Sequence, residues 1–403
     1  MNSYDAVVVG ASTAGCTAAR LLASAGARVA LVERRPDPDA YKTVCTHYIQ
    51  PSATSTIERL GLAPLIEERG AVRNSVDIWT PYSGWIRPPR EFDYGYNVTR
   101  RTLDPILRRL AADTPGVDFM PGETVVALRG NGRVSGVELE DTARMRRSLD
   151  ARVVVAADGR DSGLARLAGV RGRVRPHRRF FYWAYWSGLE PGNARSRMWF
   201  MEPDCGYTFP NEDGLTLVLA APHEDRLPEF RADLDGAYMR FIASLPDAPD
   251  LGAGAVRESK LIGKLKLPNV MRPAAARGMA FVGDAALSSD PLWGVGCGWA
   301  FQSGEWLAEE IGPALASGGE PDTGLERYRK RHRRRLGPHH FVIADLASAR
   351  AANPFERAMY RAAAHDETVY AAFEKVGTRR GSPAAVFDPR VLARILRPEK
   401  VRS

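Results

Sequence analysis

The stretch from Asp5 to Glu33 constrains the fold most, because two apolar runs flank a glycine-containing turn and an alanine-rich segment. The first run ends at Val9, the turn is Gly10-Ala-Ser-Thr-Ala-Gly15, and Ala14 to Ala25 has helical spacing before the second run, Ala27 to Val32. Buried strands of parallel sheets read as continuous apolar runs. The order strand, turn, helix, strand therefore predicts an α/β fold with a parallel sheet.

The turn has the residue types that a dinucleotide site needs. Small residues let the backbone approach a pyrophosphate, and the following helix contributes roughly half a positive charge at its N-terminus. An acid that ends the second strand suits hydrogen bonds to ribose hydroxyls. Ser12 stands where the GxGxxG pattern has its middle glycine, and the alternatives are a unit that only packs closely or a nicotinamide-binding dehydrogenase. The candidate cofactor residues here are Gly10, Ser12, Ala14, Gly15, Glu33 and Arg34.

Two later turns favour FAD over a nicotinamide cofactor. Asp158-Gly159 follows the apolar run Val153 to Ala157, and Gly283-Asp284 follows Met279 to Val282. The sequence Pro291-Leu-Trp-Gly-Val-Gly-Cys-Gly298 then opens a helix that we expect to reach Ile311. A helix start rich in glycine can stabilise a flavin ring that becomes anionic on reduction.

With these three stretches in this order, the chain resembles the flavin monooxygenase-like family, which includes p-hydroxybenzoate hydroxylase, flavin-dependent halogenases and geranylgeranyl reductases. The resemblance implies an α/β, Rossmann-like FAD-binding domain of discontinuous segments, with an inserted antiparallel β-sheet substrate domain and a helical C-terminal extension. The expected division is 1–170 for the first FAD-binding part (with loops and a helix inserted at 36–120), 171–268 for the substrate sheet, 269–319 for the last FAD-binding part, and 320–403 for the basic extension.

The resemblance also implies further contacts with FAD. Asp158 and Gly159 would lie near the pyrophosphate and the pyridine nucleotide path, and Asp284 would bind a ribityl hydroxyl. The segment Asn97-Val-Thr-Arg-Arg-Thr-Leu-Asp104 is similar to a family segment with a cofactor-binding arginine, which makes Arg100 the match, although a surface charge capping a helix is the alternative. The remaining expected contacts are the backbone of Val125 with adenine and of Pro291, Gly294 and Gly296 with the pyrimidine side of the flavin.

The substrate pocket is expected against the sheet between Phe180 and Leu267. The stretch Cys205 to Gly214 is similar to the Gly-Tyr-x-Phe-Pro stretch of the reductase and halogenase branches, whose aromatic and proline line the substrate side of the flavin. Tyr207 and Phe209, with Tyr48 and Trp293, are the candidate lining residues, and buried aromatics that only pack are the alternative. His47 could relay a proton or orient a phenol, or it could simply hold a loop.

The leading interpretation is an FAD-dependent monooxygenase that hydroxylates or epoxidises an aromatic or apolar small molecule. The resemblance implies O2, a flavin C4a-hydroperoxide, and either transient NAD(P)H or reduced flavin from a partner reductase. A geranylgeranyl reductase-like enzyme with an isoprenoid-like substrate is the runner-up, because Lys42-Thr-Val-Cys45 is weakly similar to a cysteine stretch of that branch. A halogenase is less favoured, since Trp183-Ala-Tyr-Trp186 lacks the WxWxIP signature. A binding protein that keeps the fold without using flavin is the non-enzyme alternative.

Charge and cysteine usage limit the partners. The surplus of eight positive charges lies wholly from Glu320 onward, where 18 Lys and Arg stand against 10 Asp and Glu. The run Arg327 to Arg335 could be a nucleic-acid or acidic-membrane patch, but no aromatic-rich motif accompanies it, so we expect a solvated helix face and no nucleic acid. Four scattered cysteines predict no zinc site or disulfide framework, and a reducing, cytoplasmic location. No membrane span is expected, and the helices from Phe341 to Phe373 could roof the pocket or form a homodimer face.

Overall fold

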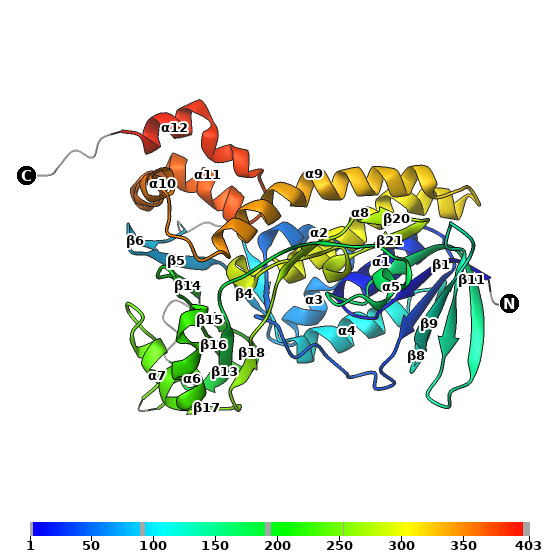
Figure 1. Cartoon of the computed structure of the whole chain (residues 1–403), viewed down its shortest axis with the longest axis horizontal. Coiled ribbons are helices and arrows are strands. Elements are labelled where there is room, and N and C mark those ends of the chain that lie inside the picture. Colours follow the sequence, from blue (N-terminus) through cyan, green and yellow to red (C-terminus); the bar gives the residue numbers. More distant parts are fainter. Residues whose placement is uncertain (1–2, 89–92, 190–194, 253, 398–403) are drawn as a thin grey trace, which may run out of the picture.

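A mostly parallel sheet contains the two apolar runs as neighbouring strands in the computed structural model, which describes residues 3–88, 93–189, 195–252 and 254–397. The strand order is β20, β21, β11, β1, β2, β8, and the hairpin of β9 and β10 pairs with β11 (Figure 1). The five strands β21, β11, β1, β2 and β8 run parallel. The bounds are β1 Ser3–Val9, β2 Val29–Glu33, β8 Val117–Pro121, β9 Thr124–Arg129, β10 Gly136–Glu140, β11 Arg146–Ala156, β20 Ala275–Ala276 and β21 Met279–Phe281.

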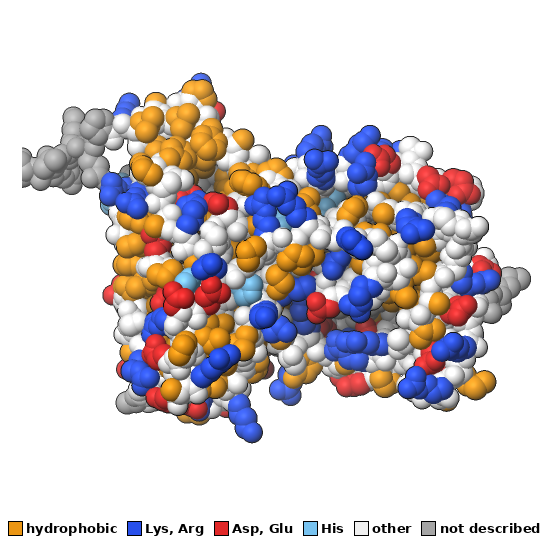
Figure 2. All heavy atoms as spheres, in the orientation of Figure 1, with side chains coloured by type: hydrophobic (Ala, Val, Ile, Leu, Met, Phe, Trp, Pro, Cys, Tyr) orange, Lys and Arg blue, Asp and Glu red, His pale blue; other side chains and the backbone are white. Residues whose placement is uncertain are grey.

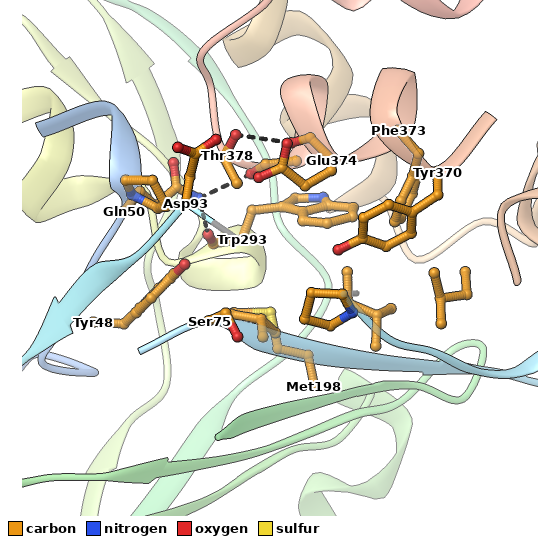
Figure 3. A pocket seen from close by; sticks show the side chains of 16 residues that line it. Tyr48, Gln50, Ser75, Asp93, Met198, Trp293, Tyr370, Phe373, Glu374 and Thr378 are labelled. Atoms are coloured by element: carbon orange, nitrogen blue, oxygen red, sulfur yellow. Dashed lines mark hydrogen bonds between the residues drawn. The ribbon is translucent and has the colours of Figure 1, made fainter. Parts of the chain in front are cut away.

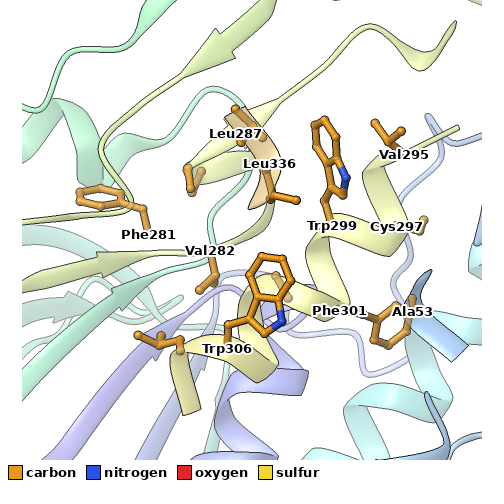
Figure 4. Close-up of a cluster of buried hydrophobic side chains, with 14 of the residues drawn as sticks. Ala53, Phe281, Val282, Leu287, Val295, Cys297, Trp299, Phe301, Trp306 and Leu336 are labelled. Carbon is orange, nitrogen blue, oxygen red and sulfur yellow. The ribbon is translucent and has the colours of Figure 1, made fainter. Parts of the chain in front are cut away.

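Helices cover this sheet because its strands are apolar on both faces. Every residue of β2 is buried, so neither face can be left to water. Three long helices pack close to the glycine turn: α1 (Thr13–Ser24), α4 (Arg100–Ala112) and α8 (Gly296–Ala316). A Cβ on Gly304 would lie 2.8 Å from the Ala14 carbonyl oxygen, so this glycine lets α8 approach α1 closely. Trp299 and Trp306 of α8 fill the neighbouring core (Figure 4).

The second sheet forms the other half of the molecule (Figure 1). Its order is β17, β13, β16, β15, β14, β5, β6, and β18 also pairs with β13. Trp186, Phe230, Tyr238 and Phe241 form a separate buried cluster beneath its short helices. The bounds are β5 Val76–Thr80, β6 Gly84–Ile86, β13 Phe181–Ser187, β14 Ser196–Phe200, β15 Cys205–Pro210, β16 Thr216–Ala221, β17 Val256–Arg257, β18 Ile262–Lys264, α6 Leu227–Ala232 and α7 Leu234–Ala243.

The α/β fold with an inserted sheet is confirmed, with one difference in which segments build that sheet. Strands β5 and β6 come from the segment 36–120, which the sequence suggested as loops, a helix and strands of the first part, and they join the second sheet. β5 pairs in parallel with β14, so the second sheet is not wholly antiparallel. A three-residue strand such as β6 carries too little alternation for its pairing partner to be read from sequence.

Two small sheets and several short helices connect the halves. Each small sheet brings together segments that are distant in the sequence. The bounds are β3 Tyr48–Ile49, β4 Val72–Asn74, β7 Gly95–Asn97, β12 Arg173–Arg175, β19 Asn269–Met271, β22 Leu287–Ser288, α2 Thr54–Arg59, α3 Ala63–Glu67 and α5 Gly163–Leu167.

The C-terminal region is helical and extends along both halves (Figure 1). After Gly377, a 3₁₀ turn over Pro383–Phe387 and a last helix, α12, complete this region. Lys and Arg side chains gather over α9, and hydrophobic ones over the last helices (Figure 2). No helix among the described residues is long and apolar enough to span a membrane. The bounds are α9 Asp322–Leu346, α10 Pro354–His365, α11 Glu367–Gly377 and α12 Pro389–Ile395.

Candidate functional site

The three turns singled out in the sequence meet at one edge of the parallel sheet. β1, β11 and β21 are neighbours, and Val9, Ala156 and Phe281 stand side by side in their register. Each of these residues is followed directly by one of the turns, because parallel strands present their carboxyl ends together. A Cβ on Gly10 would lie 2.5 Å from the Ala157 carbonyl oxygen, and one on Gly283 would lie 2.8 Å from the Ala14 methyl group. The turns therefore touch.

The glycine turn leaves backbone donors free at the start of α1. Gly10 has φ +109°, and a Cβ on Gly15 would overlap the Gly10 carbonyl oxygen, so both positions need glycine. The first hydrogen bond of the helix runs from the Cys16 N–H to the Ser12 carbonyl oxygen, so the N–H groups before Cys16 have no partner within the helix. This cradle of N–H groups at a positive helix end fits a pyrophosphate.

Glu33 closes the turn from the side of β2. Its carboxylate is buried and accepts the Ala11 N–H at 2.9 Å and the Arg35 N–H at 3.1 Å. The acid thus holds the turn in shape and still has lone pairs for a ribose hydroxyl. Arg34, the next residue, is exposed. Val125 lies on β9, half-buried and paired with Leu139 of β10, in the hairpin beside the sheet.

Arg100 joins the glycine turn to α4 and α8. Its side chain is buried and donates to the Ser12 hydroxyl at 2.6 Å, to Asp104 at 2.8 Å and to the Cys297 sulfur at 3.9 Å. Burial opposes the charge of the guanidinium, but the carboxylate of Asp104 and the sulfurs of Cys297 and Cys45 together outweigh burial and hold the pKa of Arg100 above its ordinary value. The alternative of a surface charge on a helix cap is wrong, because Arg100 is only 3% exposed.

Asp284 faces a lysine from the loop before β3. The Lys42 ammonium lies 3.0 Å from the Asp284 carboxylate, and the Lys42 backbone N–H donates to Asp104 at 2.9 Å. Burial alone would raise the pKa of Asp284, but Lys42 and the nearby Arg160 and Arg100 lower it below its ordinary value. Arg100, Asp104, Lys42 and Asp284 thus form a chain of opposite charges beside the glycine turn.

Asp158 is occupied in holding its own turn. One carboxylate oxygen accepts the Ser162 hydroxyl at 2.6 Å, and the other accepts the Leu164 N–H at 3.0 Å. Gly159 has φ +86°, and the position where a Cβ would stand is open space. The backbone of Gly159 is therefore what this turn offers to a ligand.

The loop from Asp290 to Gly296 leads into α8. Gly294 has φ +61°, and a Cβ there would lie 2.8 Å from the Tyr48 ring, whereas the space at Gly296 is open. Pro291 begins a short 3₁₀ turn that Asp290 caps through the Leu292 N–H. Burial raises the pKa of Asp290 to about 6. Open space at the first residue of a long helix again leaves backbone N–H groups available.

A cavity lies between this loop, the second sheet and α11 (Figure 3). It holds about 560 Å³ of space between atoms, part of it open to solvent. Three polar atoms of lining residues that are more than nine-tenths buried have no hydrogen-bond partner: Gln50 Oε1, Ser75 Oγ and Trp293 Nε1. The other lining side chains are mostly apolar, namely Tyr48, Pro51, Val76, Ile78, Ile86, Pro88, Met198, Tyr370 and Phe373, with Asp93, Glu374 and Thr378.

Two of the four expected lining residues belong to this cavity. Tyr48 and Trp293 line it, whereas Tyr207 and Phe209 are buried beside it and are not among its lining side chains. Phe209 stacks on Tyr48 with ring centroids 5.8 Å apart, and the Tyr207 hydroxyl donates to the Leu292 carbonyl oxygen at 3.1 Å. Tyr207 and Phe209 therefore support the loop and ring that border the space.

His47 is a buried link between three segments. Its Nδ1 accepts the Arg100 backbone N–H at 3.1 Å, and its Nε2 lies 2.5 Å from the Tyr185 hydroxyl. The backbone of His47 has φ +65° and donates to the Cys45 sulfur at 3.3 Å. Since both ring nitrogens have protein partners, the geometry favours the loop-holding alternative over proton relay.

Sequence reasoning missed several residues of the site. Lys42 and Asp104 stand in stretches that were quoted for Cys45 and Arg100, and Gln50 stands in none. The contacts Lys42–Asp104, Lys42–Asp284 and Gln50–Gly377 span between 62 and 327 residues of sequence. Tyr370 and Glu374 lie one helical turn apart on α11; Tyr370 belongs to the segment Phe341 to Phe373 that was expected to roof the pocket, and Glu374 directly follows it. Helical spacing could have placed this pair on one face, but not over the cavity.

The residues fit FAD on the observations above. Four features lie along one edge of the sheet. They are the glycine turn, the free N–H groups at the start of α1, the open backbone at Gly159 and Gly296, and the chain of opposite charges that ends at Asp284. FAD needs a pyrophosphate site, hydroxyl acceptors and a glycine-lined place for its ring. The described residues supply each of these at this edge.

Comparison with known proteins gives the same cofactor. The FAD binding domain family matches residues 3–222. The chain is 24% identical over 354 residues to digeranylgeranylglycerophospholipid reductase of Thermoplasma acidophilum (84% of this chain, 86% of that protein). It is 27% identical over 366 residues to kynurenine 3-monooxygenase of Salinispora tropica (85% of this chain, 78% of that protein).

A solved structure supports the fold. The flavin-dependent brominase Bmp2 superposes with a TM-score of 0.81 over 97% of this chain and 98% of that one, at 16% identity. At this identity the likeness concerns the fold alone. The family match, in contrast, covers more than half of the chain. The protein therefore belongs to the FAD-binding domain family and is an FAD-dependent oxidoreductase.

Proposed function

We propose that the protein is a monooxygenase that inserts one oxygen atom from O2 into an aromatic or apolar small molecule bound in the cavity beside Trp293. The observation that carries this proposal is a mostly apolar space beside Trp293, in the loop that leads into α8, with three unpaired buried polar atoms. A space of this lining excludes bulk water and orients a ligand through few polar contacts. FAD, when bound, supplies the two-electron chemistry and the reaction with O2.

The chain's own residues would hold the cofactor. We assign the pyrophosphate to the N–H groups of Ser12 to Gly15, because those of Gly10 and Ala11 donate to Val32 and Glu33, and the adenosine ribose to Glu33. Asp284 would accept a ribityl hydroxyl, while Lys42 keeps its carboxylate ionised. The N–H group of Gly296 would face the pyrimidine side of the ring, where negative charge develops on reduction, whereas the N–H of Gly294 already donates to the Pro291 carbonyl oxygen. Arg100 would add positive charge next to Ser12.

Product analysis under 18O2 tests the reaction. The protein loaded with FAD is supplied with NADPH or NADH and with a set of phenols, indoles and quinols. The masses of the products are then measured by mass spectrometry. Incorporation of one labelled oxygen supports the proposal. A second arm replaces the nicotinamide with chemically reduced FAD, because a partner reductase could supply the electrons.

The alternative with a specific observation in its favour is reduction of an isolated double bond. The relatives named above include a digeranylgeranylglycerophospholipid reductase, and the apolar cavity would accept a prenyl chain. An anaerobic assay with a geranylgeranyl lipid and dithionite-reduced protein separates the two reactions. Saturated product without oxygen would replace the monooxygenase proposal by the reductase, whereas no reaction in either assay would overturn both.

The cofactor contact at Asp284 is tested separately from turnover. Asp284→Ala removes the proposed ribityl acceptor and leaves Lys42 without its partner. The expected result is loss of FAD on gel filtration while the circular dichroism of the fold is retained. Asp161→Ala is the matched control, since Asp161 is an exposed acid in a neighbouring turn. If Asp284→Ala retained flavin as well as the control did, the assignment would be wrong.

A further inference from the structure

Two cysteines from opposite parts of the chain touch beside the proposed flavin site. The sulfurs of Cys45 and Cys297 are 3.6 Å apart and are not bonded to each other. Cys45 is half-buried in the loop before β3, and Cys297 is the second residue of α8. The other two cysteines, Cys16 and Cys205, are buried in the core.

The surroundings of the two thiols shift their pKa values in opposite directions. Cys45 accepts the His47 N–H at 3.3 Å, and Arg100 donates to Cys297 at 3.9 Å. The thiol of Cys297 and the positive groups near it lower the pKa of Cys45 well below its ordinary value, whereas the neighbouring sulfur of Cys45 raises that of Cys297. Cys45 is thus the thiol of the pair that ionises more readily. This division is the one found in dithiols that attack and then resolve a mixed disulfide.

We propose that Cys45 and Cys297 form a thiol–disulfide exchange site that reacts with low-molecular-weight disulfides such as oxidised glutathione and links the 42–47 loop to α8. The Cys45 thiolate attacks one sulfur of the small disulfide, and that S–S bond breaks as one thiolate leaves and takes up a proton. Cys297 then loses its proton, attacks the Cys45 sulfur and releases the second small thiol. Two protein thiols are oxidised by two electrons, and one small disulfide is reduced to two thiols.

The two sulfurs lie close to bonding distance. A disulfide places its sulfurs about 2.05 Å apart, so the pair must approach by about 1.5 Å. Cys45 lies in a loop and is only partly buried, whereas Cys297 is buried, so Cys45 is the thiol of the pair nearer to solvent. Cys16 offers no such route, because burial raises the pKa of its thiol far above the ordinary value.

The link would act on the cofactor site through Lys42 and Arg100. Lys42 lies three residues before Cys45 and pairs with Asp284, while Arg100 contacts Cys297. A disulfide between the loop and α8 restricts the motion that would separate Lys42 from Asp284. The disulfide form is therefore expected to release FAD more slowly than the dithiol form.

Peptide mapping of the full-length protein tests the proposal without any turnover. The protein is incubated with oxidised glutathione, alkylated under denaturing conditions and digested, and the peptide masses are measured by mass spectrometry. The expected result is a peptide pair joined through Cys45 and Cys297, about 2 Da lighter than the two reduced peptides. The alkylated thiols should fall from four to two, leaving Cys16 and Cys205. Recovery of four alkylated thiols, or of a pair that includes Cys16 or Cys205, would overturn the proposal.

Single variants separate this chemistry from a folding defect. Cys297→Ser should stop at a mixed disulfide of Cys45 with glutathione, and Cys45→Ser should take up no glutathione. Cys205→Ser is the matched control and should still form the linked pair. A thermal melt confirms that each variant folds. If Cys297→Ser remained free of glutathione while folded, Cys45 would not be the attacking thiol.

Discussion

At the residue scale, the site depends on side chains that bind several segments at once. Arg100 contacts the glycine turn, its own helix and the start of α8, and its N–H is accepted by His47. A guanidinium is suited to this role because its donors point in a fixed planar fork. Lysine would keep the charge and lose the fork.

Arg100→Lys is therefore expected to weaken FAD binding while the fold is retained. The loss of the contact with Ser12 should lower the affinity about tenfold, which corresponds to about 1.4 kcal/mol. Titration of the apoprotein with FAD, followed by flavin fluorescence, measures the change. Arg101→Lys is the matched control, because Arg101 is the exposed neighbour on α4. Equal affinities in the two variants would remove Arg100 from the cofactor site.

Single residues also mark the limit of sequence reasoning. The positions of Gly10, Gly15 and Gly283 could be predicted because their function is local, in tight turns after strands. The partners of Arg100 and Asp284 could not be predicted in the same way. Lys42 meets Asp284 across 242 residues of sequence, and such a pairing is decided by how the halves of the chain pack.

At the element scale, α11 contributes side chains to the cavity although its sequence carries none of the FAD motifs. Tyr370, Phe373, Glu374 and Gly377 recur at helical spacing and all line the cavity. The apolar members of this face were expected from the periodicity. Glu374 breaks it, and burial raises the pKa of its carboxyl above the ordinary value, against the smaller opposing effect of Lys375.

Glu374 should make the binding of a neutral aromatic depend on pH. A protonated carboxyl suits the apolar cavity, whereas the carboxylate draws in water, so affinity for p-cresol is expected to fall as pH rises through the raised pKa. Calorimetric titration of the FAD-loaded protein from pH 4.5 to 8 measures the trend. Glu374→Gln should flatten it, and Glu367→Gln, on an exposed residue of the same helix, should not. A slope unchanged in Glu374→Gln would place the ligand elsewhere.

The basic run Arg327 to Arg335 lies on helix α9. Arg327 and Arg331 pair with acids of α8, and Tyr328, His332 and Leu336 form the buried face between them. The arginines thus occupy the outer side of an amphipathic helix. The buried histidine could not be distinguished from its exposed arginine neighbours by composition, since only the helical period assigns it to the inner face.

The buried histidine should make α9 sensitive to acid. Burial, with a smaller effect of His340, lowers the pKa of His332 from 6.5 to about 4, so the folded state favours the neutral ring. This contribution is complete above pH 6.5 and is lost as pH falls toward 4, by about 3 kcal/mol. Urea unfolding at pH 7 and pH 4.5 measures it. His332→Leu should lose less stability on acidification than the wild type, and His365→Leu, at an exposed position, should behave as the wild type.

At the scale of the whole molecule, the site exists only where distant parts of the chain meet. The parallel sheet supplies the turns, the second sheet the floor of the cavity, and α11 its cover (Figures 1 and 3). The parallel sheet could be predicted because its strands are continuous and apolar. The pairing of β5 with β14 could not, since a strand pair more than 100 residues apart has no local signal.

The Gln50 side chain joins α11 to the loop before α8, and its loss should increase local opening of these two segments. Its Nε2 donates to the Trp293 carbonyl oxygen at 2.7 Å and to the Gly377 carbonyl oxygen at 3.2 Å, so it connects the β3 region, the loop before α8 and the end of α11. Gln50→Leu keeps the bulk and removes both bonds, leaving buried acceptors that cost about 1–3 kcal/mol each.

The expected result of Gln50→Leu is faster amide hydrogen exchange in α11 and in the 290–296 loop, with β1, β2 and β11 unchanged. Exchange reports local opening directly, so the effect can be separated from global destabilisation. Gln302→Leu is the matched control, because Gln302 donates to the Ser52 carbonyl oxygen and, among the described residues, makes no hydrogen bond to α11 or to the 290–296 loop. Uniform acceleration across the parallel sheet, or no change in α11, would mean that the cover of the cavity is held by its apolar contacts with Trp293 and Phe373 instead of by Gln50.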